Sequence, residues 1–148
     1  MFKSSPITVD RNGDIYVSTN YGFTYALDIK SGLIKWSLPI YSINRFSVTD
    51  KYILNTWNNR IFVINKLKGK LVFNKKLSKL NNTNRFFFRD LIVGSKNIYI
   101  FNENGFMISL NKNNLNDYSK SRIAKKFENL IISNNDLYIN TKSSILKY

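Results

Sequence analysis

The sequence contains no cysteine and no histidine. Without cysteine the chain has no disulfide, no thiolate metal site and no thiol nucleophile. Without histidine it lacks the commonest general base and metal-binding side chain of proteins. Most of the residue sets that build catalytic and metal centres are therefore excluded.

Acidic residues are also few, nine in a chain of 148. Asp14 and Asp136 stand at equivalent strand entries, and the others fit turns or the surface of the expected strands, with no pair that the sequence brings together. We therefore expect no catalytic residue, no metal ligand, no bound cofactor and no enzymatic activity. The remaining acidic residues are Asp10, Asp28, Asp50, Asp90, Glu103, Asp117 and Glu128.

Long apolar runs are missing, and no stretch approaches the roughly 18 residues of a membrane-spanning helix. The longest runs, 86–88 and 130–132, are the size of strands. The N-terminus passes directly from Met1 into the polar Ser4-Ser5-Pro6, without the apolar segment of a signal peptide. We expect either a cytosolic protein or, in preference, a chain whose natural start lies upstream of Met1.

The net charge of +14 comes mostly from lysine. A basic balance can indicate a nucleic-acid partner. Arginine, which reads base edges and phosphates in a bidentate manner, is scarce, and the abundance of Lys, Asn and Ile is typical of an AT-rich genome. We expect no nucleic-acid partner, and keep a basic nucleic-acid binder as the third hypothesis.

Aromatic residues make up 15% of the chain, which favours strands. Residues 15–19, 23–27 and 33–37 alternate apolar and polar positions and are separated by turn residues, as in a strand meander. A shift of 37 residues places 52–56, 61–64 and Phe73 on the same pattern without a gap. A third copy begins near Ile98 after an insertion around 80–85, and a fourth begins at Asp136.

A short apolar strand precedes each copy, so that the unit is four antiparallel strands in about 40 residues, the size of one propeller blade. The sequence predicts an all-β fold, a β-propeller sector of about three and a half four-stranded blades that does not close a ring on its own. The expected blades are residues 4–38, 43–78, 86–119 and an incomplete 127–148.

Residues 26–36 read A-x-D-x-x-S-G-x-x-x-W. This segment resembles the tryptophan-docking signature of PQQ-like repeats, which occur in quinoprotein dehydrogenases and in the propeller lipoprotein of the outer-membrane assembly machinery. Asp28 suits an Asx-type turn, Gly32 a positive φ, and Trp36 a contact with the next sheet. The resemblance implies that Trp36 packs between blades and that Ala26 leaves it room. Later copies carry a weaker motif at Asn65, Gly69, Phe73, Asn111 and Tyr118.

The resemblance implies a non-catalytic scaffold for protein–protein interaction in the periplasm or cell envelope of a bacterium, with protein partners that include membrane-associated ones. The alternative is a segment of a PQQ-dependent dehydrogenase whose catalytic blades lie outside this chain. The calcium-binding and vicinal-cysteine set of those enzymes is not recognisable here. The missing blades belong to the same chain or, in the less favoured alternative, to a second copy that completes the ring.

Two segments are candidate interaction surfaces. Lys66, Lys68 and Lys70 form a basic cluster, read either as a solvated hairpin loop or as a contact for anionic headgroups or an acidic partner. Phe86, Phe87 and Phe88 cannot all face inward from one strand, so that they either pack between blades or expose an interaction site.

Overall fold

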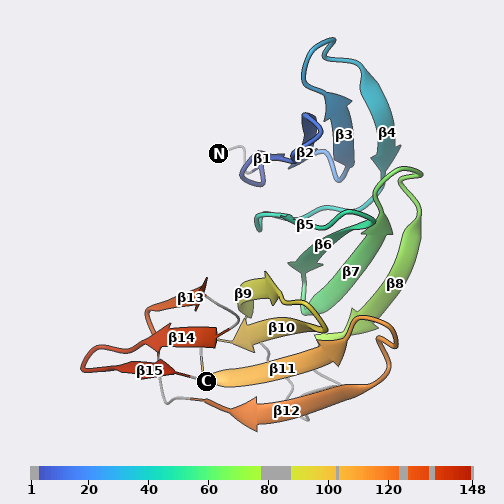
Figure 1. The fold of residues 1–148 in the computed structure, drawn as a ribbon. Helices are drawn as coiled ribbons and strands as arrows, with labels where there is room; N and C mark the ends of the chain where they lie inside the picture. Colours follow the sequence, from blue (N-terminus) through green and yellow to red (C-terminus); the bar gives the residue numbers. More distant parts are fainter. Residues whose placement is uncertain (1–3, 78–87, 103, 124–126, 134–135, 148) are drawn as a thin grey trace. The chain divides into compact units, whose positions relative to one another are not determined.

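The computed structural model describes residues 4–77, 88–102, 104–123, 127–133 and 136–147. Apart from the helical residue Leu77, the regular structure in these ranges is β-strand, arranged as four antiparallel sheets, and the predicted all-β propeller-blade fold is confirmed. The chain divides into two compact units, residues 1–77 and 78–148, and Figure 1 labels the strands of both. Within the described ranges no helix has the length and apolarity needed to cross a membrane.

Unit 1 contains two four-stranded meanders. The first is β1 (Thr8–Val9), β2 (Asp14–Ser18), β3 (Thr24–Asp28) and β4 (Ile34–Leu38), and the second is β5 (Ser47–Val48), β6 (Tyr52–Trp57), β7 (Arg60–Asn65) and β8 (Leu71–Lys76). Each strand pairs with its sequence neighbours, in the orders β1-β2-β3-β4 and β5-β6-β7-β8.

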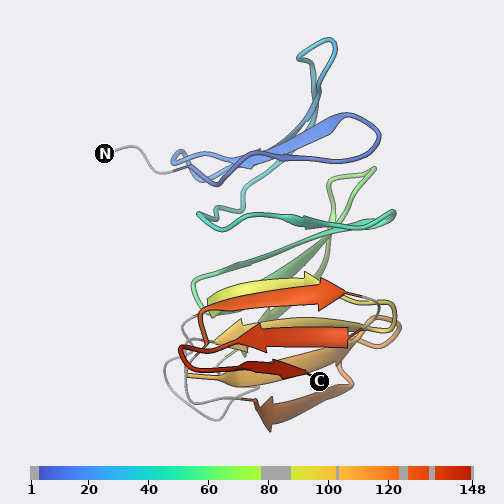
Figure 2. The same ribbon diagram turned by 60° about the vertical axis from the view of Figure 1, so that its left-hand side comes forward.

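Unit 2 repeats this plan with a four-stranded and a three-stranded sheet. The strands are β9 (Phe88–Val93), β10 (Asn97–Asn102), β11 (Phe106–Asn111) and β12 (Tyr118–Arg122), followed by β13 (Asn129–Ser133), β14 (Asp136–Asn140) and β15 (Ile145–Lys147). Figure 2 shows the strands of the second sheet lying over those of the first. Phe101, Phe127 and Ile139 belong to one buried cluster, and the rings of Phe101 and Phe127 meet edge to face at 6.0 Å.

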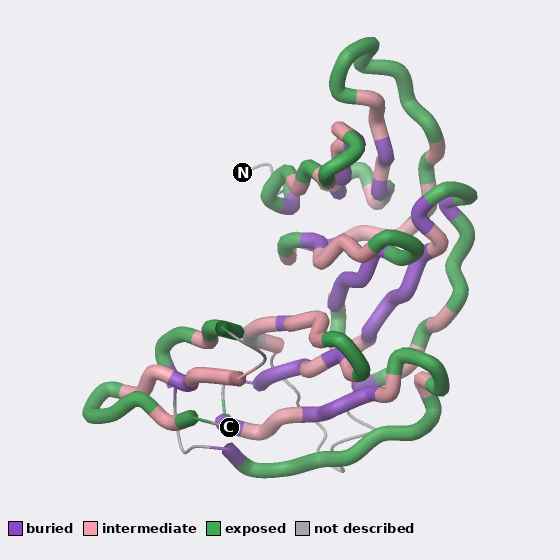
Figure 3. The backbone as a smooth tube through the Cα atoms, viewed as in Figure 1, coloured by how far each residue is buried: buried purple, intermediate pink, exposed green. Residues whose placement is uncertain are grey.

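Burial alternates with period 2 along β2 and β3 of the first sheet in unit 1. On β2 the buried residues are Asp14, Tyr16 and Ser18, while Ile15 and Val17 are partly exposed. The central strands β6 and β7 are buried over most of their length, which Figure 3 shows as continuous purple. Strands buried on both faces read as continuous apolar runs, as 61–64 does.

The hairpin between β6 and β7 has a two-residue connection. Asn58 has φ 47° and Asn59 has φ 62°, and Trp57 pairs with Arg60 across the turn. Two positive φ values are typical of a type I′ turn, in which Asn is well tolerated. The tight connection between the expected strands 52–56 and 61–64 therefore has a direct conformational reason. The insertion expected at 80–85 lies outside the described residues.

Candidate functional site

Antiparallel connections place the loops of unit 1 on two opposite rims. We call one the tryptophan rim and the other the connector rim. The tryptophan rim comprises the turns at 10–13, 28–33, 49–51 and 65–70, and the connector rim comprises 19–23, 39–46 and 58–59.

Trp36 joins the two sheets of unit 1 at the tryptophan rim. Its indole Nε1–H donates a hydrogen bond of 2.8 Å to the carbonyl of Lys66 in the β7–β8 turn. A Cβ built on Gly69 would lie 2.6 Å from Trp36 Cγ, so that only glycine lets the ring approach this closely. Ala26 pairs with Trp36 across β3 and β4, and Tyr16 lies 6.2 Å from the indole ring.

The turn before Trp36 has the expected chemistry. Asp28 Oδ1 accepts hydrogen bonds from the backbone amides of Lys30 and Ser31, at 3.1 and 2.8 Å, and from the Ser31 hydroxyl at 2.9 Å. These hydrogen bonds lower the pKa of the Asp28 carboxyl, and those from Ser31 have the largest effect. Gly32 has φ 71°, as expected.

The second repeat copies this turn. Asn65 Oδ1 accepts a 2.9 Å hydrogen bond from the Lys68 amide, and Gly69 has φ 62°. A register shift follows Val63 as one follows Ala26, so that Phe73 pairs with Val63 as Trp36 pairs with Ala26.

The third repeat departs from the pattern. Asn111 Oδ1 still accepts a hydrogen bond from the amide of Asn113, at 2.9 Å. β11 and β12 pair without a register shift, and Tyr118 pairs with Leu110, while Ser119 faces Ser109. Tyr118 therefore does not take the position of Trp36, because the third turn lacks the glycine and the shift that set the aromatic position in the first two copies.

Lys66 is not on the solvated surface expected for the basic cluster. Its ammonium lies 2.9 Å from Asp10 Oδ2, and the two side chains are only 7% and 6% exposed. The expectation of a solvated or partner-binding Lys66 is wrong, because the β7–β8 turn folds back onto the β1–β2 turn and buries the side chain. Lys68 and Lys70 are exposed.

Several hydrogen-bond donors surround the Asp10 carboxylate. Burial alone would raise the pKa of Asp10, but the hydrogen bonds from Lys66 and from the amides of Asp14 and Asn12 outweigh it and lower the pKa. The Tyr16 hydroxyl lies 3.2 Å from Asp10 Oδ2, and burial together with the nearby carboxylates raises the pKa of Tyr16. The ion pair therefore fixes one sheet of unit 1 to the other.

A second ion pair lies beside it. Lys35 donates to Asp14 and lies 3.7 Å from Asp28, and the hydrogen bond to Asp14 raises the pKa of Lys35. Sequence reasoning assigned Asp10, Asp14 and Asp28 only to turns and strand entries, and in the structure these three side chains act as partners for lysines.

Phe88, the first residue of β9, is half-buried and pairs with Asn102. Phe86 and Phe87 lie outside the described residues. Within the described ranges no group of three His, Cys, Asp or Glu side chains comes together as a metal site.

Buried hydroxyl and amide groups hold the segment between β4 and β5 at the connector rim. Thr24 Oγ1 donates a 2.6 Å hydrogen bond to the Ile40 carbonyl, and the Ser42 amide donates to Ser18 Oγ at 3.2 Å. Thr24, Ser18 and Ser42 are each fully buried. Residues on both sides of Tyr41 are therefore fixed to the first sheet.

The same segment is also fixed to the second sheet. The Ser42 hydroxyl lies 2.8 Å from Asn55 Oδ1, and Asn44 Nδ2 donates a 2.6 Å hydrogen bond to the Thr56 carbonyl. Asn55 Nδ2 returns a 3.1 Å hydrogen bond to the Asn44 carbonyl. The result is a connection with little freedom to move, which positions its own side chains.

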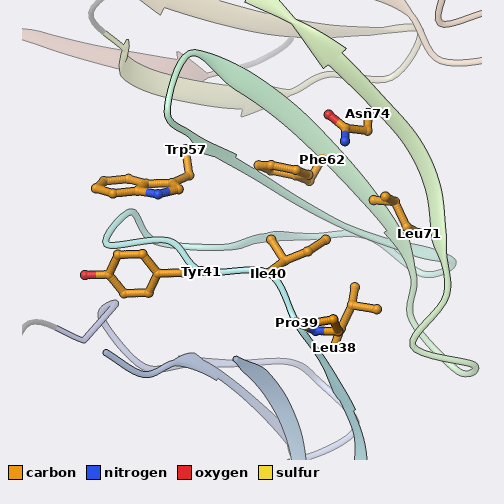
Figure 4. A pocket seen from close by; sticks show the side chains of 8 residues that line it. All are labelled: Leu38, Pro39, Ile40, Tyr41, Trp57, Phe62, Leu71 and Asn74. Atoms are coloured by element: carbon orange, nitrogen blue, oxygen red, sulfur yellow. The ribbon is translucent and has the colours of Figure 1, made fainter. Parts of the chain in front are cut away.

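A pocket of about 420 Å³ opens beside this connection. Tyr41 and Trp57 meet edge to face at its one end, with ring centroids 5.0 Å apart and an interplanar angle of 79°. Figure 4 shows Phe62 and Ile40 in the middle and Leu71 towards the other end. The full lining is Leu38, Pro39, Ile40, Tyr41, Trp57, Phe62, Leu71 and Asn74.

Sequence reasoning did not identify this pocket. Its walls come from the connection after β4 and from residues of four strands, β4, β6, β7 and β8. No local pattern brings Tyr41 and Trp57 together. Trp57 offers a signal in the sequence, because it directly precedes the Asn58-Asn59 turn. An aromatic residue at the end of a hairpin strand lies on a rim of the sheet, where it can line a pocket.

No family model matches the chain, and no curated protein resembles it in sequence. Solved structures match it in fold. BamB from Moraxella catarrhalis matches 97% of the chain at 14% identity with a TM-score of 0.75, and the dihydro-heme d1 dehydrogenase NirN matches 99% at 8% identity with a TM-score of 0.72. The WD40 domain of SCAP from fission yeast matches the whole chain at 12% identity with a TM-score of 0.63.

The chain spans 41% of BamB, 34% of NirN and 42% of the SCAP domain. These three proteins are of different kinds and share a blade architecture. At such low sequence identity the similarity establishes the fold and not the activity. The four sheets are those of a β-propeller, of which this chain contains a part.

Proposed function

We propose that the chain is part of a non-catalytic β-propeller scaffold of the PQQ-like repeat type, which binds another protein in the bacterial cell envelope. The observation that carries this proposal is the contact of Trp36 with Gly69 and with the Lys66 carbonyl. It is the inter-blade tryptophan contact that the motif at 26–36 implies. The fold similarity to BamB over 97% of the chain supports the same proposal.

The mechanism is presentation of loops on rigid sheets. Binding residues of many proteins lie on loops that a rigid scaffold positions. In unit 1 the ion pair of Lys66 and Asp10 and the docked Trp36 fix the sheets at one rim, while the connection at 39–46 is hydrogen-bonded at the other. The connector rim can then offer side chains to a partner with little loss of conformational entropy.

The experiment that tests this function is a photo-crosslinking scan in cells that express the natural protein. A photoreactive phenylalanine analogue replaces, one at a time, exposed residues such as Tyr21, Leu33 and Leu67 and the rim residue Tyr41. We expect a discrete cross-linked protein from at least one position, in the envelope fraction. Absence of any cross-linked protein contradicts the scaffold function.

The competing dehydrogenase hypothesis has its own signature. A segment of a PQQ-dependent enzyme would bind PQQ in a calcium-dependent manner and support reduction of an artificial dye by an alcohol. We expect neither from the purified chain or from the whole protein that contains it. Calcium-dependent quinone binding with dye reduction by the whole protein would replace the scaffold proposal.

A further inference from the structure

The pocket at the connector rim combines an apolar lining with an aromatic pair at its mouth. Seven of its lining residues are apolar or aromatic, and Asn74 supplies one amide. Tyr41 and Trp57 are partly exposed, and Leu71 is 41% exposed, so that the pocket is open to solvent. Tyr and Trp are the residue types that contribute most at protein interfaces.

The size of the pocket limits its occupant. A volume of about 420 Å³ lies near the lower end of the roughly 300–1,000 Å³ of ligand pockets. It suits one or two large side chains of a peptide segment. The hydrogen bonds that hold Ile40 and Ser42 fix the Tyr41 wall of the pocket before any ligand arrives.

Charge selects the kind of segment. Arg60 and Lys76 pair across β7 and β8, two residues from the pair Phe62 and Asn74, and therefore lie on the pocket face of this sheet. Arg60 Nε donates a 2.6 Å hydrogen bond to Asn74 Oδ1 at the pocket wall. This end of the pocket is therefore positively charged.

Among the described residues 4–77, no acidic residue lies beside these cations at the connector rim. Residues 4–77 contain four acidic residues, and all four lie at the tryptophan rim: Asp10, Asp14, Asp28 and Asp50. Asp10 is paired with Lys66, and Asp14 and Asp28 with Lys35. The connector rim of unit 1 thus presents an apolar pocket in a surface whose charge is only positive.

We propose that this pocket binds an acidic peptide segment of a partner protein, with one large apolar or aromatic side chain inserted between Tyr41, Trp57 and Phe62 and its carboxylates facing Arg60 and Lys76. The inference rests on the proposed scaffold function and names its partner class and its binding site. The two aromatic rings meet edge to face and do not form the parallel platform on which nucleic-acid bases stack.

The test uses isothermal titration of the full chain with the blocked pentapeptide Asp-Glu-Phe-Glu-Asp. We expect saturable one-to-one binding that weakens as salt is added. The peptide with Ala in place of Phe is expected to bind at least about tenfold more weakly, and Lys-Lys-Phe-Lys-Lys not at all. Binding of a short oligothymidine in competition with the acidic peptide, at equal or higher affinity, would overturn the peptide assignment in favour of nucleic acid.

Matched variants locate the site. Trp57→Ala is expected to weaken binding at least about tenfold, and Arg60→Gln about threefold with a smaller salt dependence. Tyr21→Ala removes a 78% exposed aromatic from the same rim and is expected to leave binding unchanged. Asn74→Trp, at an exposed position of β8, fills the pocket without removing core and is expected to abolish binding even if Trp57→Ala fails to fold.

The two experiments distinguish a wrong pocket proposal from a wrong scaffold proposal. If the acidic peptide does not bind, or binds Asn74→Trp as well as the parent chain, the pocket proposal is wrong. A cross-linked partner at Tyr21, Leu33 or Leu67 would then show that the scaffold function stands and uses another surface.

Discussion

Replacing Gly69 by alanine tests how the two sheets of unit 1 are joined. Gly69 has φ 62°, and alanine in this left-handed region costs about 1–2 kcal/mol. The added Cβ would also lie 2.6 Å from two atoms of the Trp36 ring. Forcing a carbon into packed surroundings costs typically about 1–3 kcal/mol. We expect Gly69→Ala to lower the free energy of unfolding by about 2–5 kcal/mol in total.

Gly32 provides the matched control. It occupies the same turn position in the first repeat and has φ 71°, but a Cβ there meets nothing within 4 Å. Gly32→Ala should therefore cost only the backbone term of about 1–2 kcal/mol. Urea denaturation followed by far-ultraviolet circular dichroism measures both variants. In a Trp36→Ala background, which removes both ring atoms that lie 2.6 Å away, most of the additional cost of Gly69→Ala should disappear.

Equal costs for the two glycine variants would refute this reasoning. So would a full additional cost of Gly69→Ala in the Trp36→Ala background, since the clash could not then come from the indole ring.

Three further predictions concern the tryptophan rim and the β6–β7 turn. Lys66→Met leaves the Asp10 carboxylate buried without its cation and should cost about 3–5 kcal/mol in urea denaturation, while the exposed Lys68→Met should stay within about 0.5 kcal/mol. Folding lowers the pKa of Asp10, so the stability that its carboxylate contributes is fully present above the unfolded-state pKa of about 3.9 and is lost as the pH falls through the folded-state pKa. The urea concentration at the unfolding midpoint should therefore decrease when the pH is lowered below about 4, and it should decrease less in Asp10→Asn. Asn59→Gly keeps the positive φ and removes a buried Oδ1 without a hydrogen-bond partner, and should raise the unfolding free energy by about 0.5–1 kcal/mol, whereas Asn59→Ala should lower it. Each contact would be contradicted by the opposite result. These results are no loss of unfolding free energy in Lys66→Met, an unchanged loss of stability below about pH 4 in Asp10→Asn, and a lower unfolding free energy in Asn59→Gly.

Strands and turns were predictable because their causes are local. Alternation at 15–19 and 23–27 becomes β2 and β3, and the Asp28-to-Gly32 spacing becomes a hydrogen-bonded turn. The repeat at 52–73 follows for the same reason. Turn chemistry and period-2 patterning are properties of a few neighbouring residues, and they survive in each copy that keeps its glycine.

Apart from the Trp36 contact, which the family resemblance implied, contacts between repeats were not predictable from local patterns. Lys66 stands in a lysine-rich hairpin and resembles a solvated residue, and only the folded chain brings it to Asp10, 56 positions away. Tyr118 is an aromatic residue near the position expected for a third Trp36, yet the missing register shift leaves it opposite Leu110. The pocket of Tyr41 and Trp57 likewise depends on how one sheet lies against the next, which no single repeat encodes.

The most direct test of this account is the exchange and shift of the two indole N–H groups in a ¹H–¹⁵N spectrum of the full chain. The chain has two tryptophans, so that each signal can be assigned with Trp36→Phe. We predict that the Trp36 indole, hydrogen-bonded to the Lys66 carbonyl, exchanges slowly with solvent and does not shift with the acidic peptide, whereas the partly exposed Trp57 indole exchanges quickly and shifts on titration. Fast exchange of the Trp36 indole would contradict the inter-sheet contact, and a peptide titration that leaves the Trp57 signal unmoved would contradict the pocket.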